Sequence, residues 1–295
     1  MQQKDSEKYS IIAAKGTYKK YYLLKAVLEI LPGEIDAGKC LLICEAGSDG
    51  FSYVVKNEET NEIISFGAYH YTNHHVHDSD CSILKKIFKD HILLSGNFKK
   101  VFIIYSFPES VLVPFEMYNS QKNSSILNMI HGDLTENHAV LSDVIVDIQA
   151  YNIYRIPSQL KEDLVAQFPS AEIVHQYSVL ARNSLADNNK LSVIFYPNKI
   201  VVALKKGGKL LLVNSFLYKT AEDVSYTLLN ICSRFQMDNI AIEASGLIEQ
   251  NSGLYKEIYK YFEQVCFASM PGGISLTDDI LTYPPHFFCH LFTTG

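Results

Sequence analysis

Three apolar runs joined by tight turns, and the alternating helix and strand patterns after them, constrain the fold of residues 191–270. The runs span 191–196, 199–205 and 209–218, and their aliphatic and β-branched residues are typical of buried strands. Pro197-Asn198 and Gly207-Gly208 separate the runs and favour turns, because proline presets φ while asparagine and glycine accept positive φ. We therefore expect a meander of three antiparallel strands.

Helical spacing replaces the strand pattern after this meander. Thr220 is a candidate helix cap, and Glu222 and Asp223 lie in the first turn, where the helix dipole favours acids. The later patterns predict a helix to about Phe235, a strand over 239–244, a helix over 252–262 and a strand over 265–270. The order β-β-β-α-β-α-β is the ribonuclease-H-like layout, a mixed sheet with helices on its faces.

The order β-β-β-α-β also occurs in the first half of the chain. Its predicted strands span 40–46, 51–56, 63–71 and 99–106, with a helix that begins at Asp80 or Ser82 and ends near Leu94. Between the two copies we expect an edge strand over 110–114, helices over 120–131, 158–168 and 177–185, and strands over 143–148, 152–157 and 171–176. Residues 21–31 have helical spacing and predict a helix that Pro32-Gly33 ends.

These patterns predict an α/β protein of two tandem ribonuclease-H-like domains, each with a mixed sheet flanked by helices. We expect an N-terminal extension (1–38), a first domain (39–188) and a second domain with a C-terminal tail (189–295), with the polar link Asp187-Asn188-Asn189 at the boundary. The aromatic residues after Met270 suggest a short element packed on the body of the protein.

Composition excludes several classes of function. With a net charge of −6, the chain lacks the excess of positive charge that is typical of nucleic-acid-binding proteins. No apolar run approaches the length of a membrane span, and the first residues are polar, unlike a signal peptide. The six cysteines are scattered and form no CxxC pair, which is typical of reduced thiols in a cytosolic protein. We therefore expect a cytoplasmic protein.

Several segments resemble the actin-like ATPase superfamily. Residues 156–185 are similar to the end of the first domain in the cell-division protein FtsA and the pilus protein PilM, where a helix, a strand and a second helix lead into the second domain. Residues 216–235 and 242–262 are similar to the matching part of the PilM second domain. More closely, the chain resembles a bacterial family of unknown function, number 3822, over roughly residues 40–290. The resemblance implies the actin-like fold and no activity.

The resemblance also implies where a nucleotide would bind. In the superfamily, the first hairpin turn of each domain carries a glycine, which lets backbone amides approach the phosphates, and an acid, which helps to hold the metal. The first turn here contains Gly47, Asp49 and Gly50 and imitates such a loop, although any hairpin turn has this composition. The second turn contains Pro197, which lacks an N–H, and neither glycine nor acid, so Asn198 and Lys199 form a poor half of a phosphate clamp.

The charge of Lys199 and the loop over 243–247 complete the implied nucleotide site. Lys199 could attract a phosphate only as a mobile point charge. The glycine-rich adenosine loop of the superfamily corresponds to 243–247, where Ser245 precedes the single glycine, Gly246. We therefore expect a degenerate, non-hydrolysing relative, with no assigned cofactor and with ATP as the open alternative.

The other clusters of polar residues do not identify a catalytic or metal-binding site. The richest polar cluster is His70, His74, His75, His77, Asp78, Asp80 and Cys81, and a second is His286, Cys289 and His290. Imidazole, thiolate and carboxylate are good zinc or iron ligands, but neither spacing matches a ligand signature. The strand over 191–196 carries no acid, which argues against a two-metal nuclease.

We predict a catalytically silent binding or scaffolding module with a protein partner that the sequence does not identify. The alternative is a PilM-like ATP-binding protein or weak ATPase, and a third hypothesis is a metal-dependent enzyme that uses the histidine cluster. The partner, the pathway and the oligomeric state do not follow from the sequence.

Overall fold

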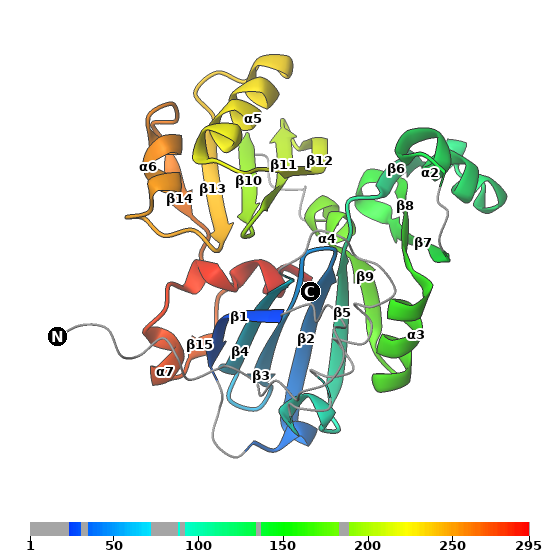
Figure 1. Ribbon diagram of the computed structural model, residues 1–295, viewed down its shortest axis with the longest axis vertical. Helices are drawn as coiled ribbons and strands as arrows, with labels where there is room; N and C mark the ends of the chain where they lie inside the picture. The colour runs from blue at the N-terminus through cyan, green and yellow to red at the C-terminus, as the bar shows by residue number, and fades with distance from the viewer. Residues whose placement is uncertain are drawn as a thin grey trace, which may run out of the picture.

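The computed structural model describes residues 24–30, 35–71, 88, 92–133, 137–182 and 189–294. It contains two α/β units, each built on a mixed sheet with helices beside it, and a small lobe attached to the first unit (Figure 1). The predicted fold class is therefore confirmed.

The first unit is built on a seven-stranded sheet. Its strands are β1 (Leu24–Ile30), β2 (Cys40–Gly47), β3 (Gly50–Asn57), β4 (Glu62–Tyr71), β5 (Lys100–Ser106), β9 (Glu172–His175) and β15 (Ser275–Leu276). The order is β1-β4-β3-β2-β5-β9, and β15 also pairs with β4. β2, β3 and β4 form the predicted antiparallel meander; β5 pairs parallel with β2, and β9 pairs parallel with β5.

The helix predicted over 21–31 is wrong, because Leu24–Ile30 is the strand β1, antiparallel to β4. The pairing register shifts between Ala26 and Leu28, which is a bulge. Leu24, Ala26, Leu28 and Ile30 have the two-residue period of a strand, so this short apolar run fits either element and the pairing with β4 decides between them. The helix predicted between Asp80 or Ser82 and Leu94 lies mostly outside the described residues, and Ile92–Ser95 is a short 3-10 helix, η2.

The small lobe is a three-stranded antiparallel sheet with one helix against it. It consists of β6 (Ser110–Pro114), β7 (His138–Ile145), β8 (Ala150–Pro157), α2 (Asn123–His131) and the 3-10 turns η3 (Phe115–Met117), η4 (Ser120–Lys122) and η5 (Val146–Ile148). β6 is the predicted edge strand, because the strand order is β6-β8-β7. The strand predicted over 143–148 ends earlier, since Val146–Ile148 is a turn and Gln149 adopts a φ of 51°.

Two helices connect the small lobe to the rest of the protein. α3 (Ser158–Gln167) and α4 (Gln176–Arg182) flank β9, as the sequence predicts. α3 covers the first sheet through Leu160 and Leu164, which join its buried core. α4 lies against both the small lobe and the second sheet, so it links the two units.

The second unit is built on a five-stranded sheet in the order β12-β11-β10-β13-β14. Its elements are β10 (Lys190–Phe195), β11 (Lys199–Lys206), β12 (Lys209–Leu217), α5 (Ala221–Arg234), β13 (Ala241–Gly246), α6 (Gly253–Tyr259) and β14 (Val265–Phe267). Thr220 caps α5 in a reciprocal capping box with Asp223, which confirms the predicted helix start. β10, β13 and β14 are parallel, as the predicted crossovers require.

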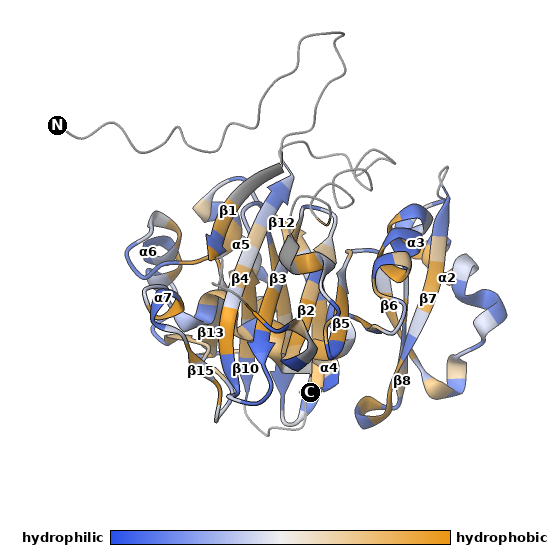
Figure 2. Ribbon diagram, turned by 90° about the horizontal axis from the view of Figure 1, so that it is seen from below, coloured by the Kyte–Doolittle hydropathy of each residue, from blue (hydrophilic) through white to orange (hydrophobic). Residues whose placement is uncertain are grey.

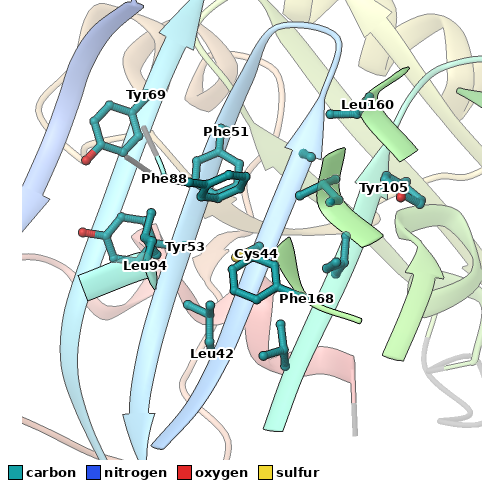
Figure 3. Packing of buried hydrophobic residues seen from close by; sticks show 14 of the residues in the cluster. Leu42, Cys44, Phe51, Tyr53, Tyr69, Phe88, Leu94, Tyr105, Leu160 and Phe168 are labelled. Carbon is teal, nitrogen blue, oxygen red and sulfur yellow. The ribbon is translucent and has the colours of Figure 1, made fainter. Parts of the chain in front are cut away.

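Aromatic packing holds one face of the first sheet. Phe88 makes edge-to-face contacts with Phe51 and Phe168, whose ring centroids lie 5.8 and 5.6 Å away (Figure 3). Hydrophobic residues run along β2 and β3, in the interior of this unit (Figure 2). These two strands are therefore rigid supports for the turn that joins them.

The C-terminal tail packs on the opposite face of the first sheet, as its aromatic residues predict. It forms α7 (Asp278–Leu281), η7 (Pro285–Phe287) and η8 (Cys289–Thr294); in Figure 1 this red segment begins beside β15 at the edge of the first sheet and then passes between the two units. Phe288 is buried with its ring 5.3 Å from that of Phe66 on β4. The tail thus returns to the first unit after the second one is complete, while the boundary near residue 188 stays a prediction.

Candidate functional site

The turn between β2 and β3 faces the turn between β10 and β11 across a cleft between the two units. Each turn follows the first strand of a meander, so both lie at the same end of their sheets. Side chains from the two turns contact each other directly and close the cleft at this point. The two predicted halves of a nucleotide site therefore do come together in space.

Lys199 and Asp49 form an ion pair across the cleft. Lys199 Nζ lies 2.6 Å from Asp49 Oδ1, and their side chains are only 4% and 11% exposed. The ammonium also donates to Ser106 O at 3.3 Å and Ser106 Oγ at 3.2 Å, and lies 4.7 Å from the centroid of the Tyr196 ring. The prediction of a mobile charge at Lys199 is wrong, because this buried first residue of β11 points into the cleft and is held from three sides.

Glu45 and Tyr196 form a second contact across the cleft. The Tyr196 hydroxyl donates to Glu45 Oε1 at 2.6 Å and accepts from Gln176 Nε2 at 2.5 Å. Gln176 Nε2 also lies 3.3 Å from Glu45 Oε2, and Ser106 Oγ donates to Gln176 Oε1 at 2.9 Å. We call the six residues Glu45, Asp49, Ser106, Gln176, Tyr196 and Lys199 the cleft network.

Burial sets the protonation of this network. It raises the pKa of Glu45 to about 7, against the opposing effects of the Tyr196 hydrogen bond and the Lys199 charge. Burial, reinforced by Glu45, also holds the pKa of Tyr196 well above its ordinary value, so the phenol stays a donor. His290 Nε2 lies 3.8 Å from Glu45 Oε2, but burial lowers the pKa of His290 to about 4, so this contact is not an ion pair at neutral pH.

The glycines of the candidate site have structural roles in the strands. A Cβ at Gly50 would collide with the carbonyl oxygen of Tyr69 on the neighbouring strand β4. Gly246, which follows Ser245 at the end of β13, has a φ of 79°, and a Cβ there would collide with the carbonyl oxygen of Phe195. Close backbone packing therefore explains both glycines without a bound phosphate.

The remaining candidate residues lie at the margins of the cleft network. Gly47 ends β2, and Asn198 accepts a backbone hydrogen bond from Tyr218 through its carbonyl oxygen, at 2.9 Å. Ser245 is buried in β13, opposite Ile194. Gly47, Asp49, Gly50 and Gly246 line the cavity described next, whereas Asn198, Lys199 and Ser245 do not.

The cavity beside the cleft network is small and mainly apolar. It has a volume of about 40 Å³ and is lined by side chains that include Phe66, Phe195, Leu247 and Phe287. A cavity of this size holds a few water molecules.

Three residues at or beside the cleft network could not be assigned to this site from the sequence. Ser106 ends β5, Gln176 begins α4 and His290 lies in the tail, so they come from three segments far apart in the chain. A serine and a glutamine outside any motif match ordinary surface or core residues, and His290 was noted only within a candidate metal cluster. The pairing of β5 with β2 brings Ser106 to the cleft, and the return of α4 and of the tail brings Gln176 and His290 there.

The structure describes only His70 of the first histidine cluster, and it describes all of the second cluster. His74, His75, His77, Asp78, Asp80 and Cys81 lie outside the described residues, and His70 is near the end of β4. His286 Nε2 is 2.6 Å from the carbonyl oxygen of Ile248, and its ring stacks on Phe267. Cys289, also in the tail, is buried beside His286.

In the ranges that the structure describes, no helix has the length and apolarity needed to cross a membrane.

Comparisons with known proteins agree with this architecture. The profile of a family described as "Protein of unknown function (DUF3822)" matches residues 34–265. A Bacteroides thetaiotaomicron protein with actin-like ATPase fold and unknown function superposes with a TM-score of 0.66 at 21% identity, over 85% of this chain and 100% of that one. PilM, in the PilM-PilN type IV pilus biogenesis complex, superposes with a TM-score of 0.53 at 9% identity, over 86% of this chain and 97% of that one. No curated protein matches the sequence significantly.

Proposed function

Because this chain belongs to the DUF3822 family and has the actin-like ATPase fold, we propose that it is a catalytically silent member of that fold, a module that binds or scaffolds a protein partner. The family description gives no activity, so the proposal rests on the cleft.

The ion pair between Lys199 and Asp49 is the observation that carries the proposal. In a phosphate clamp, backbone amides and a cation converge on the anion. Here the cation already has a carboxylate partner, and the Tyr196 ring lies over it. A triphosphate would have to break the Lys199–Asp49 pair, and unless a metal ion offsets the carboxylate it would then lie against a negative charge, which is unfavourable in a buried site.

We propose a protein as the ligand of this module. A fold that binds no nucleotide still has two units with a cleft between them and a projecting small lobe, and these surfaces can contact a protein partner. PilM, which has the same fold, was solved as a complex with PilN. That likeness supports a partner of the protein class and does not identify it.

Mg-ATP binding tests the proposal directly. We expect Mg-ATP to leave the melting temperature of the full chain unchanged and to be hydrolysed no faster than in buffer. A ligand at about a hundred times its dissociation constant stabilises a true binder by about 2.7 kcal/mol, which a melting curve resolves. Stabilisation of that size, or hydrolysis above background, would contradict catalytic silence.

ATP binding is the alternative function, and the convergence of Gly47, Asp49 and Lys199 at the cleft favours it. If Mg-ATP does stabilise the protein, Asp49→Asn tests the site, with the melting temperature of the ligand-free variant as its own reference. Loss of the ATP-induced shift in this variant places the nucleotide at the cleft network. Glu59→Gln, a neutralisation at an exposed carboxylate in the turn between β3 and β4, is the matched control.

A further inference from the structure

The cleft network joins the two units through the turn between β10 and β11. Tyr196 follows the end of β10 and Lys199 begins β11, so both side chains come from the second unit. The Tyr196 hydroxyl lies 2.6 Å from Glu45 Oε1, and Lys199 Nζ lies 2.6 Å from Asp49 Oδ1, both in the first unit. A change of charge in this network therefore acts directly on the contact between the units.

Other contacts join the units beside this network. Tyr177 of α4 packs against Ile194 and Val201 on the second sheet, and His286 Nε2 of the tail lies 2.6 Å from the Ile248 carbonyl oxygen. α4 and the tail lie between the two units in Figure 1. Burial raises the pKa of Tyr177 to about 12 and lowers that of His286, so both side chains are neutral at neutral pH. These contacts can hold the units together while the charge of the cleft network changes.

The cleft network contains two carboxyl groups and one ammonium group. Lys199 pairs with Asp49, whereas Glu45 is held by neutral donors, the hydroxyl of Tyr196 and the amide of Gln176. Glu45 is 4% exposed, and a buried carboxylate without a counter-ion of its own is unfavourable. Ionised Glu45 therefore places a second negative charge in the closed cleft against a single positive charge.

The titratable groups that face Glu45 from other elements do not supply the missing charge. They are Tyr69 and His70 on β4, His175 on β9 and His290 in the tail. Burial lowers the pKa of His290 to about 4 and that of His175 to about 3, so both rings are neutral at neutral pH. Burial also raises the pKa of Tyr69, which keeps its phenol neutral. His70 lines the cavity beside Glu45 and therefore needs a control variant of its own.

Burial determines when Glu45 ionises. It raises the pKa of the carboxyl group to about 7, against the Tyr196 hydrogen bond and the Lys199 charge, which favour ionisation. In the protonated form Oε1 accepts from Tyr196, and Oε2, 3.8 Å from Nε2 of the neutral His290, carries the proton. In an open cleft, water reaches the group and its pKa returns towards the ordinary 4.5. The closed cleft therefore binds this proton more tightly than an open one.

We propose that Glu45 is a proton-controlled latch between the two units. Protonated Glu45 keeps the turn of Tyr196 and Lys199 closed on the first unit, and ionised Glu45 lets this turn move away. Residues of both units line the cavity beside Glu45, so water enters there when the turn moves. This inference goes beyond the proposed function, because it concerns the ligand-free cleft and does not depend on what the cleft binds.

The direction of the pH dependence follows from proton linkage. Because the closed cleft binds the proton more tightly, the open fraction rises with pH. The ratio of open to closed protein should rise by up to about tenfold for each pH unit between 4.5 and about 7, and it should level off outside this window.

Hydrogen exchange of the full chain, followed by mass spectrometry of its peptides between pH ~5 and pH ~8, tests the proposal. Division by the intrinsic exchange rates gives a protection factor that reports even a small open fraction. We expect peptides over the two turns, 45–51 and 195–200, to lose protection by up to about tenfold for each pH unit below pH ~7.

Low concentrations of urea separate opening of the cleft from unfolding. α5 lies in the core on the other face of the second sheet, and it is the reference for exchange by unfolding. Urea accelerates exchange in proportion to the surface that an opening exposes. It should therefore accelerate exchange in α5 and leave exchange at the two turns nearly unchanged.

Three variants assign the pH dependence to one residue. Glu45→Gln keeps the acceptor for Tyr196 but cannot ionise, so both turns should stay protected at every pH. Tyr196→Phe removes the hydroxyl and keeps the ring, and it should lose protection at the turns already at pH ~5. His70→Gln removes the histidine that lines the cavity and should behave like the wild type.

Wild-type protection at the turns that stays constant with pH overturns the proposal, and this result does not depend on any variant folding. The proposal also fails if urea accelerates exchange at the turns as much as in α5, because the opening is then unfolding. A pH dependence that remains in Glu45→Gln, or disappears in His70→Gln, assigns the proton to another group and equally overturns the latch.

Discussion

Replacing Glu45 with Gln should change how the stability of this protein depends on pH. Glu45 is buried at the bottom of the cleft, accepts a hydrogen bond from Tyr196 and lies near Asp49, Lys199 and His290. Burial raises its pKa from the ordinary 4.5 to about 7. Glutamine has a similar shape and keeps a carbonyl oxygen for the Tyr196 hydroxyl, but it cannot ionise.

The sign and magnitude follow from proton binding. Between pH 4.5 and about 7 the folded protein holds a proton on Glu45 that the unfolded chain has released. The stabilisation is therefore complete below pH 4.5 and is lost as the pH rises through about 7. At about 1.4 kcal/mol for each pH unit, the loss amounts to about 3 kcal/mol.

Urea unfolding of the wild type and of Glu45→Gln at several pH values measures this loss. The stability of the variant relative to the wild type should rise by about 3 kcal/mol between pH ~5 and pH ~8. Titrating groups that do not contact Glu45, including the buried His175, are common to both proteins and cancel in the comparison, and His290, with a pKa lowered to about 4, stays neutral over this range. A difference between Glu45→Gln and wild type that is constant with pH would refute the assignment of a raised pKa to Glu45.

Three further variants test other contacts by the free energy of unfolding. Asp49→Asn leaves the buried Lys199 ammonium without its counter-charge and should destabilise the protein by about 3 kcal/mol; a loss below about 1 kcal/mol would show that the pair is dispensable. Gly246→Ala should destabilise by about 2 kcal/mol even without nucleotide, because its positive φ and the Phe195 carbonyl oxygen exclude a Cβ; a neutral effect would show that the backbone relaxes. Thr220→Ala removes half of the capping box and should lose about 1 kcal/mol, with Thr220→Ser retaining most of it.

Local patterns in the sequence were enough to predict most of the fold. The meanders of β2–β4 and β10–β12 follow from apolar runs with turn residues between them, and the start of α5 follows from Thr220 and the acids after it. These features depend on residues a few positions apart, and their physical cause is local. The β1 strand was missed because a short apolar run fits both a helix and a strand, and only the pairing of β1 with the distant β4 decides between them.

The candidate site required the tertiary structure, because its contacts join residues that are distant in the chain. Glu45 and Tyr196 are 151 positions apart, Glu45 and Gln176 are 131 apart, and Ser106 and Lys199 are 93 apart. The sequence did show that the second turn lacks the glycine and acid of a phosphate clamp. It could not show that Lys199 is paired with Asp49, since a lysine at the start of a strand can point either to solvent or to a buried carboxylate. The two sheets, α4 and the tail pack around one cleft. This packing determines that Lys199 lies against the carboxylate of Asp49 and not in solvent.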